Sequence, residues 1–141
     1  GKKTAFSELF GAEGAAIADA LQGALPTISL STHTALNTAF ANDVEPSLIF
    51  AQQVLGYAQC GDVLLGISTS GNSKNVCAAA MTARVCGAKV IALTGQGGGQ
   101  LAKLADRALM APDTRTFRVQ EYHLAIYHYL CAAIESELFE Q

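Results

Sequence analysis

The stretch that decides the fold is GDVLLGISTSGNSKNV, residues 61–76. It begins with an apolar run at residues 63–67, which is too short for a helix and typical of a buried strand. Hydroxyl, glycine and amide residues follow, and a helical pattern resumes at Lys74. This order predicts an anion site, because the first N–H groups of a helix lack intrahelical partners and carry the positive end of its dipole.

The side chains of the turn support this prediction. Gly71 lets the backbone approach a ligand closely, and the polar residues expected to contact a phosphate are Ser68, Thr69, Ser70, Asn72 and Ser73. Gly66 and Gly71 have the spacing of the Walker glycines, but Asn72-Ser73 replaces the Lys-Ser/Thr pair, so a small phosphate ester fits better than a nucleotide. The alternative is an ordinary N-cap, in which Asn72 or Ser73 closes the helix and binds nothing.

The run GDVLLGISTSGNS resembles the phosphosugar-binding loop of SIS (sugar isomerase) domains, and most of all that of the phosphoheptose isomerases. The resemblance extends over residues 25–139. It implies a three-layer, doubly wound parallel sheet of flavodoxin-like topology, without the first strand of the family pattern. We expect one domain over residues 1–141, with residues 1–24 as an N-terminal connection.

Composition sets limits on the partners. The 141 residues are 50% hydrophobic and only 15% charged, so we expect an oligomer, a tetramer or a dimer, that hides apolar surface. The net charge of −3 gives no basic surface for nucleic acid. No run has the length of a membrane span and no signal peptide is recognisable. The four cysteines form no Cys-x-x-Cys pair, and we interpret them as reduced thiols of a cytoplasmic protein.

The rest of the chain alternates between strand and helix patterns. Residues 1–13 show no clear period and suggest an exposed start; Gly23 and Gly87 are expected to end helices. The expected helices are residues 14–22, 34–41, 46–55, 74–86, 100–105 and 117–138, and the expected strands are residues 27–30, 63–67, 89–94 and 107–110. Such alternation predicts a parallel sheet with helices on both faces and a ligand site at the carboxyl ends of the strands.

The last helix carries a second group of polar residues. Gln120 and His128 lie about 80° apart around its axis, and Glu121 and His128 about 20° apart. An imidazole and an amide oxygen can help to bind a divalent metal, and His128 can also move a proton. The alternative is that His123 and His128 are hydrogen-bonded core residues.

The resemblance adds roles to these residues. It implies that Gln120 and His128 are zinc ligands, that Gln120 also lies at the substrate, and that His128 is a catalytic acid or base. It also implies that Asp43 contacts substrate, although a simple turn residue is an equal alternative. We interpret His33 as a helix-start residue, and the glycine-rich residues 95–99 as a flexible turn rather than a second phosphate site.

The family pattern also contains an earlier His and Glu, which supply zinc ligands and a catalytic base and have no match here. Phe117 stands where the family has an Asp. Two functions follow. The first is isomerisation of sedoheptulose 7-phosphate to manno-heptose 7-phosphate, in which a carboxylate and His128 move a proton between C1 and C2. The second is a non-catalytic domain that binds a sugar phosphate or a partner, as relatives that regulate replication initiation or transcription do.

Overall fold

The three strands pair in chain order, β1–β2–β3, into one parallel sheet. The computed structural model describes residues 2–139. Its elements are α1 (Lys2–Ala20), α2 (Thr34–Asp43), the 3₁₀ helix η1 (Pro46–Leu48), α3 (Ile49–Tyr57), β1 (Val63–Ser68), α4 (Lys74–Val85), β2 (Lys89–Thr94), α5 (Gly99–Leu104), β3 (Arg107–Met110) and α6 (Thr116–Phe139).

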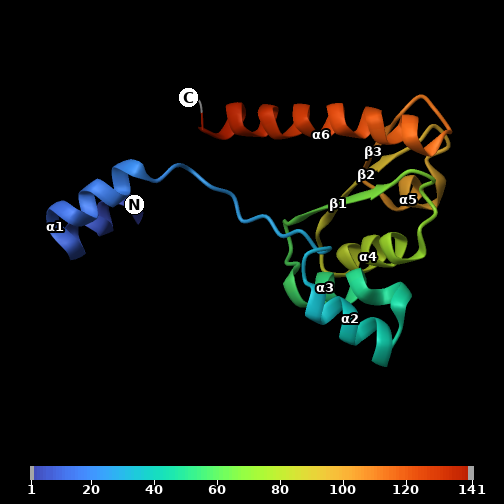
Figure 1. Ribbon diagram of the computed structural model, residues 1–141, viewed down its shortest axis with the longest axis horizontal. Helices are drawn as coiled ribbons and strands as arrows, with labels where there is room; N and C mark the ends of the chain where they lie inside the picture. Colours follow the sequence, from blue (N-terminus) through green and yellow to red (C-terminus); the bar gives the residue numbers. More distant parts are fainter. Residues whose placement is uncertain (1, 140–141) are drawn as a thin grey trace.

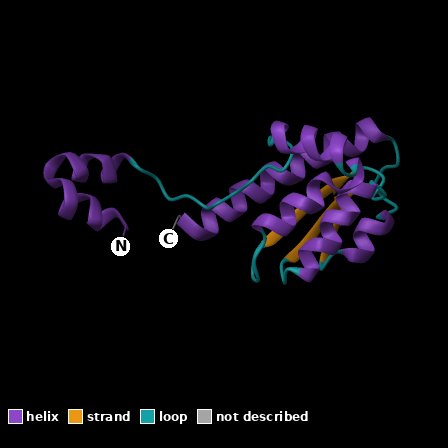
Figure 2. Ribbon diagram, turned by 90° about the horizontal axis from the view of Figure 1, so that it is seen from below, coloured by secondary structure: helices purple, strands orange, loops and turns teal. Residues whose placement is uncertain are grey.

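Helices cover both faces of the sheet (Figure 1). The two crossover helices, α4 and α5, pack on the same face as α3, whereas α6 lies across the other face. Figure 2 shows the strands enclosed between these layers. The expected three-layer α/β class is therefore confirmed. Because all three strands are parallel, their carboxyl ends meet at one edge of the sheet.

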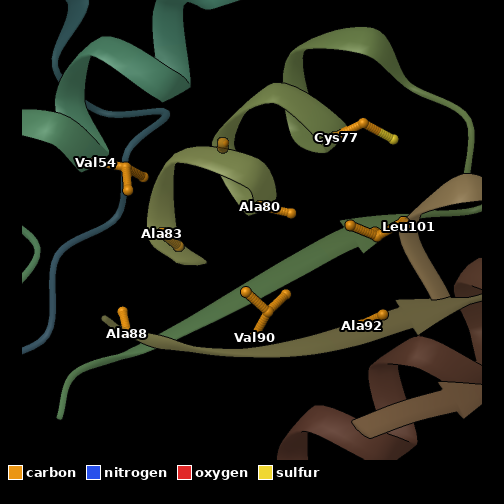
Figure 3. Packing of buried hydrophobic residues seen from close by; sticks show 9 residues of the cluster. Val54, Cys77, Ala80, Ala83, Ala88, Val90, Ala92 and Leu101 are labelled. Atoms are coloured by element: carbon orange, nitrogen blue, oxygen red, sulfur yellow. The ribbon is translucent and has the colours of Figure 1, made fainter. Parts of the chain in front are cut away.

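Small side chains allow α4 to lie close to the sheet (Figure 3). Ala80 and Ala83 are fully buried against Val90 and Ala92 of β2, and Leu101 of α5 closes the same cluster. Burial of a side chain such as Val90 or Leu101 stabilises the fold by about 1.5–3 kcal/mol. The core thus holds in place the strand and the helix on either side of the loop at residues 68–73.

One expected strand is wrong. Residues 27–29 belong to an exposed connection, whereas Leu30 packs partly buried against the core. The Leu30 carbonyl accepts the side-chain amides of Asn37 and Gln53, and the Thr32 N–H and hydroxyl both donate to the Ser29 carbonyl, so these carbonyls bond to side chains or close a turn and do not pair with a strand. Pro26, just before this stretch, also lacks the N–H that a strand ladder needs.

The beginning of the chain also differs from the expectation. Residues 2–20 form α1, which stands apart from the sheet, bends at Gly11 and ends before the expected stop at Gly23 (Figure 1). Gly14 packs against the Phe6 carbonyl in this bend. The exposed character expected for residues 1–13 holds for most of those described, but Ala5 and Phe6 are half-buried and the helical structure was not expected. Residues 1, 140 and 141 of the expected domain lie outside the described range.

Candidate functional site

The serine loop (residues 68–73) leaves the carboxyl end of β1 and leads into α4. Ser68 is buried at the end of the strand, and its hydroxyl lies 2.9 Å from the Ser73 hydroxyl. The Gly71 N–H donates to the Ser68 carbonyl at 3.0 Å, which makes a tight turn. These two bonds bring the beginning and the end of the loop together around the exposed Ser70.

The helix that follows begins without a capping bond from its N-cap residue, although the Val76 N–H of its first turn donates to the Asn75 Oδ1 at 2.9 Å. Ser73 occupies the N-cap position of α4, but its side chain makes no capping hydrogen bond. The first turn carries Lys74 and no acidic residue. The positive charge of Lys74 therefore adds to the positive, N-terminal end of the helix dipole. The simple N-cap alternative therefore does not describe this helix start, because the serine hydroxyl that would close it is turned towards Ser68.

One acidic residue, Glu45, lies near the same helix start, and another, Asp43, precedes it in the chain. Asp43 is the last residue of α2 and is exposed, and η1 just after it packs on α4. Glu45, which the sequence reasoning missed, accepts the Ser47 N–H at 3.0 Å. This bond lowers the pKa of the Glu45 carboxyl, and the positive charge of Lys74 adds to the effect. A Glu directly before Pro46 was the available signal, because that position caps the short helix.

On α6, Gln120 and His128 lie two turns apart, about 12 Å along the helix axis, and both are exposed. They remain the candidate zinc ligands of this helix. His123 is buried instead, and its Nε2 donates to the Thr94 carbonyl oxygen at 3.1 Å. His123 therefore fixes α6 to the end of β2. Within residues 2–139 no three His, Cys, Asp or Glu side chains gather as a metal site would need.

The remaining histidine and Phe117 have structural neighbours. His33 begins α2 through its carbonyl, which accepts the Asn37 N–H, and its ring lies against Tyr57, with Nδ1 3.4 Å from the tyrosine oxygen. The helix-start interpretation of His33 is thus confirmed for its backbone. Phe117 lies under two guanidinium groups, those of Arg115 at 5.6 Å and Arg118 at 5.8 Å from the ring centre. Arg115 also pairs with Asp113 and holds the pKa of that carboxyl well below its usual range.

Comparisons with known proteins agree with this fold and this loop. The family model described as SIS domain matches residues 4–95, and the chain belongs to that family. It is 44% identical over 115 residues to the phosphoheptose isomerase of Sulfurimonas denitrificans, covering 82% of this chain and 59% of that protein. It is 49% identical over 111 residues to the phosphoheptose isomerase of Nitratiruptor sp., covering 79% of this chain and 59% of the relative.

Two solved structures are also similar. One is phosphoheptose isomerase GmhA from Neisseria gonorrhoeae, with a TM-score of 0.75 and 43% identity over 77% of this chain and 61% of that one. The other is a phosphoheptose isomerase from Francisella tularensis, with a TM-score of 0.79 and 39% identity over 82% and 62% of the two chains. The present chain thus spans about 60% of the length of these relatives, so the activity of a whole relative is not transferred to it directly.

Proposed function

We propose that the serine loop binds the phosphate group of a phosphorylated sugar. The support is its geometry: hydroxyls at both ends of a tight turn, an uncapped helix start and Lys74 in the first turn. An anion placed there would receive hydrogen bonds from serine hydroxyls and from the first N–H groups of α4, apart from the Val76 N–H, which donates to the Asn75 Oδ1 at 2.9 Å.

The sugar we propose is sedoheptulose 7-phosphate, and the reaction is its isomerisation to manno-heptose 7-phosphate. The observation that carries this proposal is the 44–49% identity to relatives named phosphoheptose isomerase over about four fifths of the chain. In such a reaction the phosphate anchors the substrate while a proton moves between C1 and C2. Asp43, exposed at the C-terminal end of α2, is our candidate for a contact to the sugar.

His128 is our candidate for the proton-transfer step. It lies on the side of α6 that faces away from the sheet, nearly opposite the buried Val119 and His123. An imidazole in this position would meet a sugar only where another chain or segment packs on α6 and encloses it. We therefore propose that the assembly, rather than one copy of residues 2–139, completes the catalytic site.

The outer surface of α6 supports such an assembly. Apolar or small residues recur on it every three or four positions from Leu124 onwards, as in a coiled-coil seam: Leu124, Tyr127, Cys131, Ile134 and Leu138. Phe117 lies on the same side, seven positions before Leu124. Phe117, Leu124, Ile134 and Leu138 are 58%, 48%, 47% and 52% exposed in one copy. We propose that two copies pack through this seam, with a tetramer as the larger assembly.

One copy of the described chain offers too few ligands for zinc. Gln120 and His128 would supply two, whereas a catalytic zinc site needs three from protein, and no three His, Cys, Asp or Glu side chains gather within residues 2–139. We therefore derive no step through the metal and propose that this chain alone is metal-poor. After incubation with zinc and dialysis, elemental analysis should find much less than one ion per chain; full occupancy would contradict this account of α6.

The experiment for the proposed function is calorimetric titration with sedoheptulose 7-phosphate, followed by an assay for manno-heptose 7-phosphate. Saturable binding supports the phosphate site, and turnover supports the isomerase. Binding without turnover, also after addition of zinc, would favour a non-catalytic sugar-phosphate domain. An absence of binding would overturn the proposal. We also propose a cytoplasmic location, with which the four free cysteines agree. Among the described helices, none is long and apolar enough to cross a membrane.

A further inference from the structure

The glycine loop (residues 95–99) lies directly behind the serine loop. A Cβ atom on Gly71 would collide with the Gly98 carbonyl oxygen, and one on Gly99 would lie 2.6 Å from the Gly71 carbonyl carbon. Both glycines have a positive φ, +67° and +59°, that other residues rarely adopt. The Gly71 carbonyl also accepts the Leu101 N–H at 2.8 Å. The two loops therefore touch backbone to backbone, with no room for a side chain.

The amides of the glycine loop are already used within the protein. The N–H groups of four of its residues donate to carbonyl oxygens at 2.7–3.1 Å; the pairs are Gly95 with Thr69, Gln96 with Asp113, Gly98 with Gly95, and Gly99 with Gly97. A phosphate cradle needs several N–H groups that point at the ligand. This loop therefore supports the serine loop rather than forming a second phosphate site.

Asn72 joins the two loops through its side chain. Its Oδ1 accepts the Gln100 N–H at 3.0 Å, at the first turn of α5, where that N–H has no intrahelical partner. Its Nδ2 donates to the Ser70 carbonyl at 3.1 Å, and its backbone N–H donates to the Ser70 hydroxyl at 3.1 Å. Both polar atoms of the amide are thus engaged inside the protein and not turned towards a ligand.

We propose that Asn72 is a positioning residue: it fixes Ser70 and Gly71 in the phosphate-binding conformation by tying them to the start of α5. This inference rests on the proposed phosphate site and corrects the direct phosphate contact expected for Asn72. A loop held in its bound conformation loses less freedom when the ligand arrives, so the tie raises affinity without touching the phosphate.

The test uses inorganic phosphate as the probe and two single variants. Asn72→Ala removes the acceptor, and Gln100→Pro removes only the donor, because proline lacks an N–H and is tolerated in the first turn of a helix. Each should weaken phosphate binding by roughly five- to tenfold, the equivalent of one hydrogen bond. The double variant should bind no more weakly than Asn72→Ala, because Gln100→Pro breaks a link that Asn72→Ala has already removed, whereas Asn72→Ala also loses the bond to the Ser70 carbonyl. Gln100→Ala, which keeps the N–H, is the matched control and should bind as the parent does.

Hydrogen exchange keeps the inference testable even if the parent protein binds no phosphate. The Gly71 amide should exchange about tenfold faster in both variants, while the melting temperature changes little. Unchanged Gly71 exchange in both variants would overturn the inference. Full phosphate affinity in Gln100→Pro together with a loss in Asn72→Ala would also overturn it, because Asn72 would then contact the phosphate directly. Failure of the parent protein to bind phosphate would instead count against the proposed function.

Discussion

Candidate site residues lie both in the serine loop and on the outer surface of α6, but one copy of the chain forms only the first of these two sites in full. The loop is complete: its hydroxyls, its turn and its supporting glycine loop all belong to the same copy. The α6 surface presents Gln120 and His128 between exposed apolar residues, with nothing from residues 2–139 packed over them. The serine loop consists of contiguous residues and can therefore be described from one copy. The site on α6 depends on which other chain or segment covers the helix.

The largest effect we expect comes from a charge placed in the loop. Ser70→Asp would set a carboxylate against the bound phosphate, and two like charges about 4 Å apart near a surface repel by about 4 kcal/mol. Affinity for sedoheptulose 7-phosphate should fall by roughly a hundredfold or more. Ser7→Asp in α1, with the same charge change, is the control and should bind normally. Native affinity in Ser70→Asp would show that the loop does not hold the phosphate.

A substitution on α6 should have the opposite effect: it should disrupt the assembly and leave phosphate binding unchanged. Leu124→Arg places a charge in the centre of the apolar seam and should convert the assembly to a monomer, as measured by light scattering. Phosphate affinity should stay within about twofold of the parent value, because the serine loop is complete in one copy. Ala125→Arg lies on the same helix about 100° away from Leu124 and should leave the assembly intact. A parent protein that is itself monomeric would contradict the proposed seam.

The buried and exposed histidines of α6 offer a smaller contrast. His123→Ala removes a buried hydrogen bond to Thr94 and leaves a cavity, so the free energy of unfolding should fall by about 2 kcal/mol. His128→Ala should change it by less than about 0.5 kcal/mol, since that side chain is exposed in one copy. Denaturant titration of the two variants under conditions where the protein is monomeric measures the difference. Equal losses would mean that His128 is also part of the core.

Most of the sheet could be predicted from sequence because its signals are local. Apolar runs gave the strands at residues 63–67, 89–94 and 107–110, and Gly87, with φ +79°, ends the helix before β2 as expected. Residues 27–30 have the composition of a strand but lie beyond the sheet, so composition alone misled. The helix at residues 2–10 was missed because its apolar stripe, Ala5, Phe6, Leu9 and Phe10, is short and stops at Gly11, where the backbone leaves the helical conformation.

The candidate site was predictable only in part, for the same reason. The serine loop was found because strand, turn and helix start are contiguous in the sequence. The role of Asn72 depends on Gln100, which is 28 residues away, and that of His123 on Thr94, which is 29 residues away. No local pattern distinguishes a side chain that faces a ligand from one that faces another loop.

The most direct test of the central claim is to locate the bound phosphate by nuclear magnetic resonance. The ¹⁵N-labelled chain would be titrated with sedoheptulose 7-phosphate while its amide signals are followed. We predict that the largest shifts fall on the amides of residues 69–75, with smaller shifts in the glycine loop and none along the outer surface of α6. Large shifts centred on residues 95–99 or on α6, with residues 69–75 unmoved at saturation, would contradict the account.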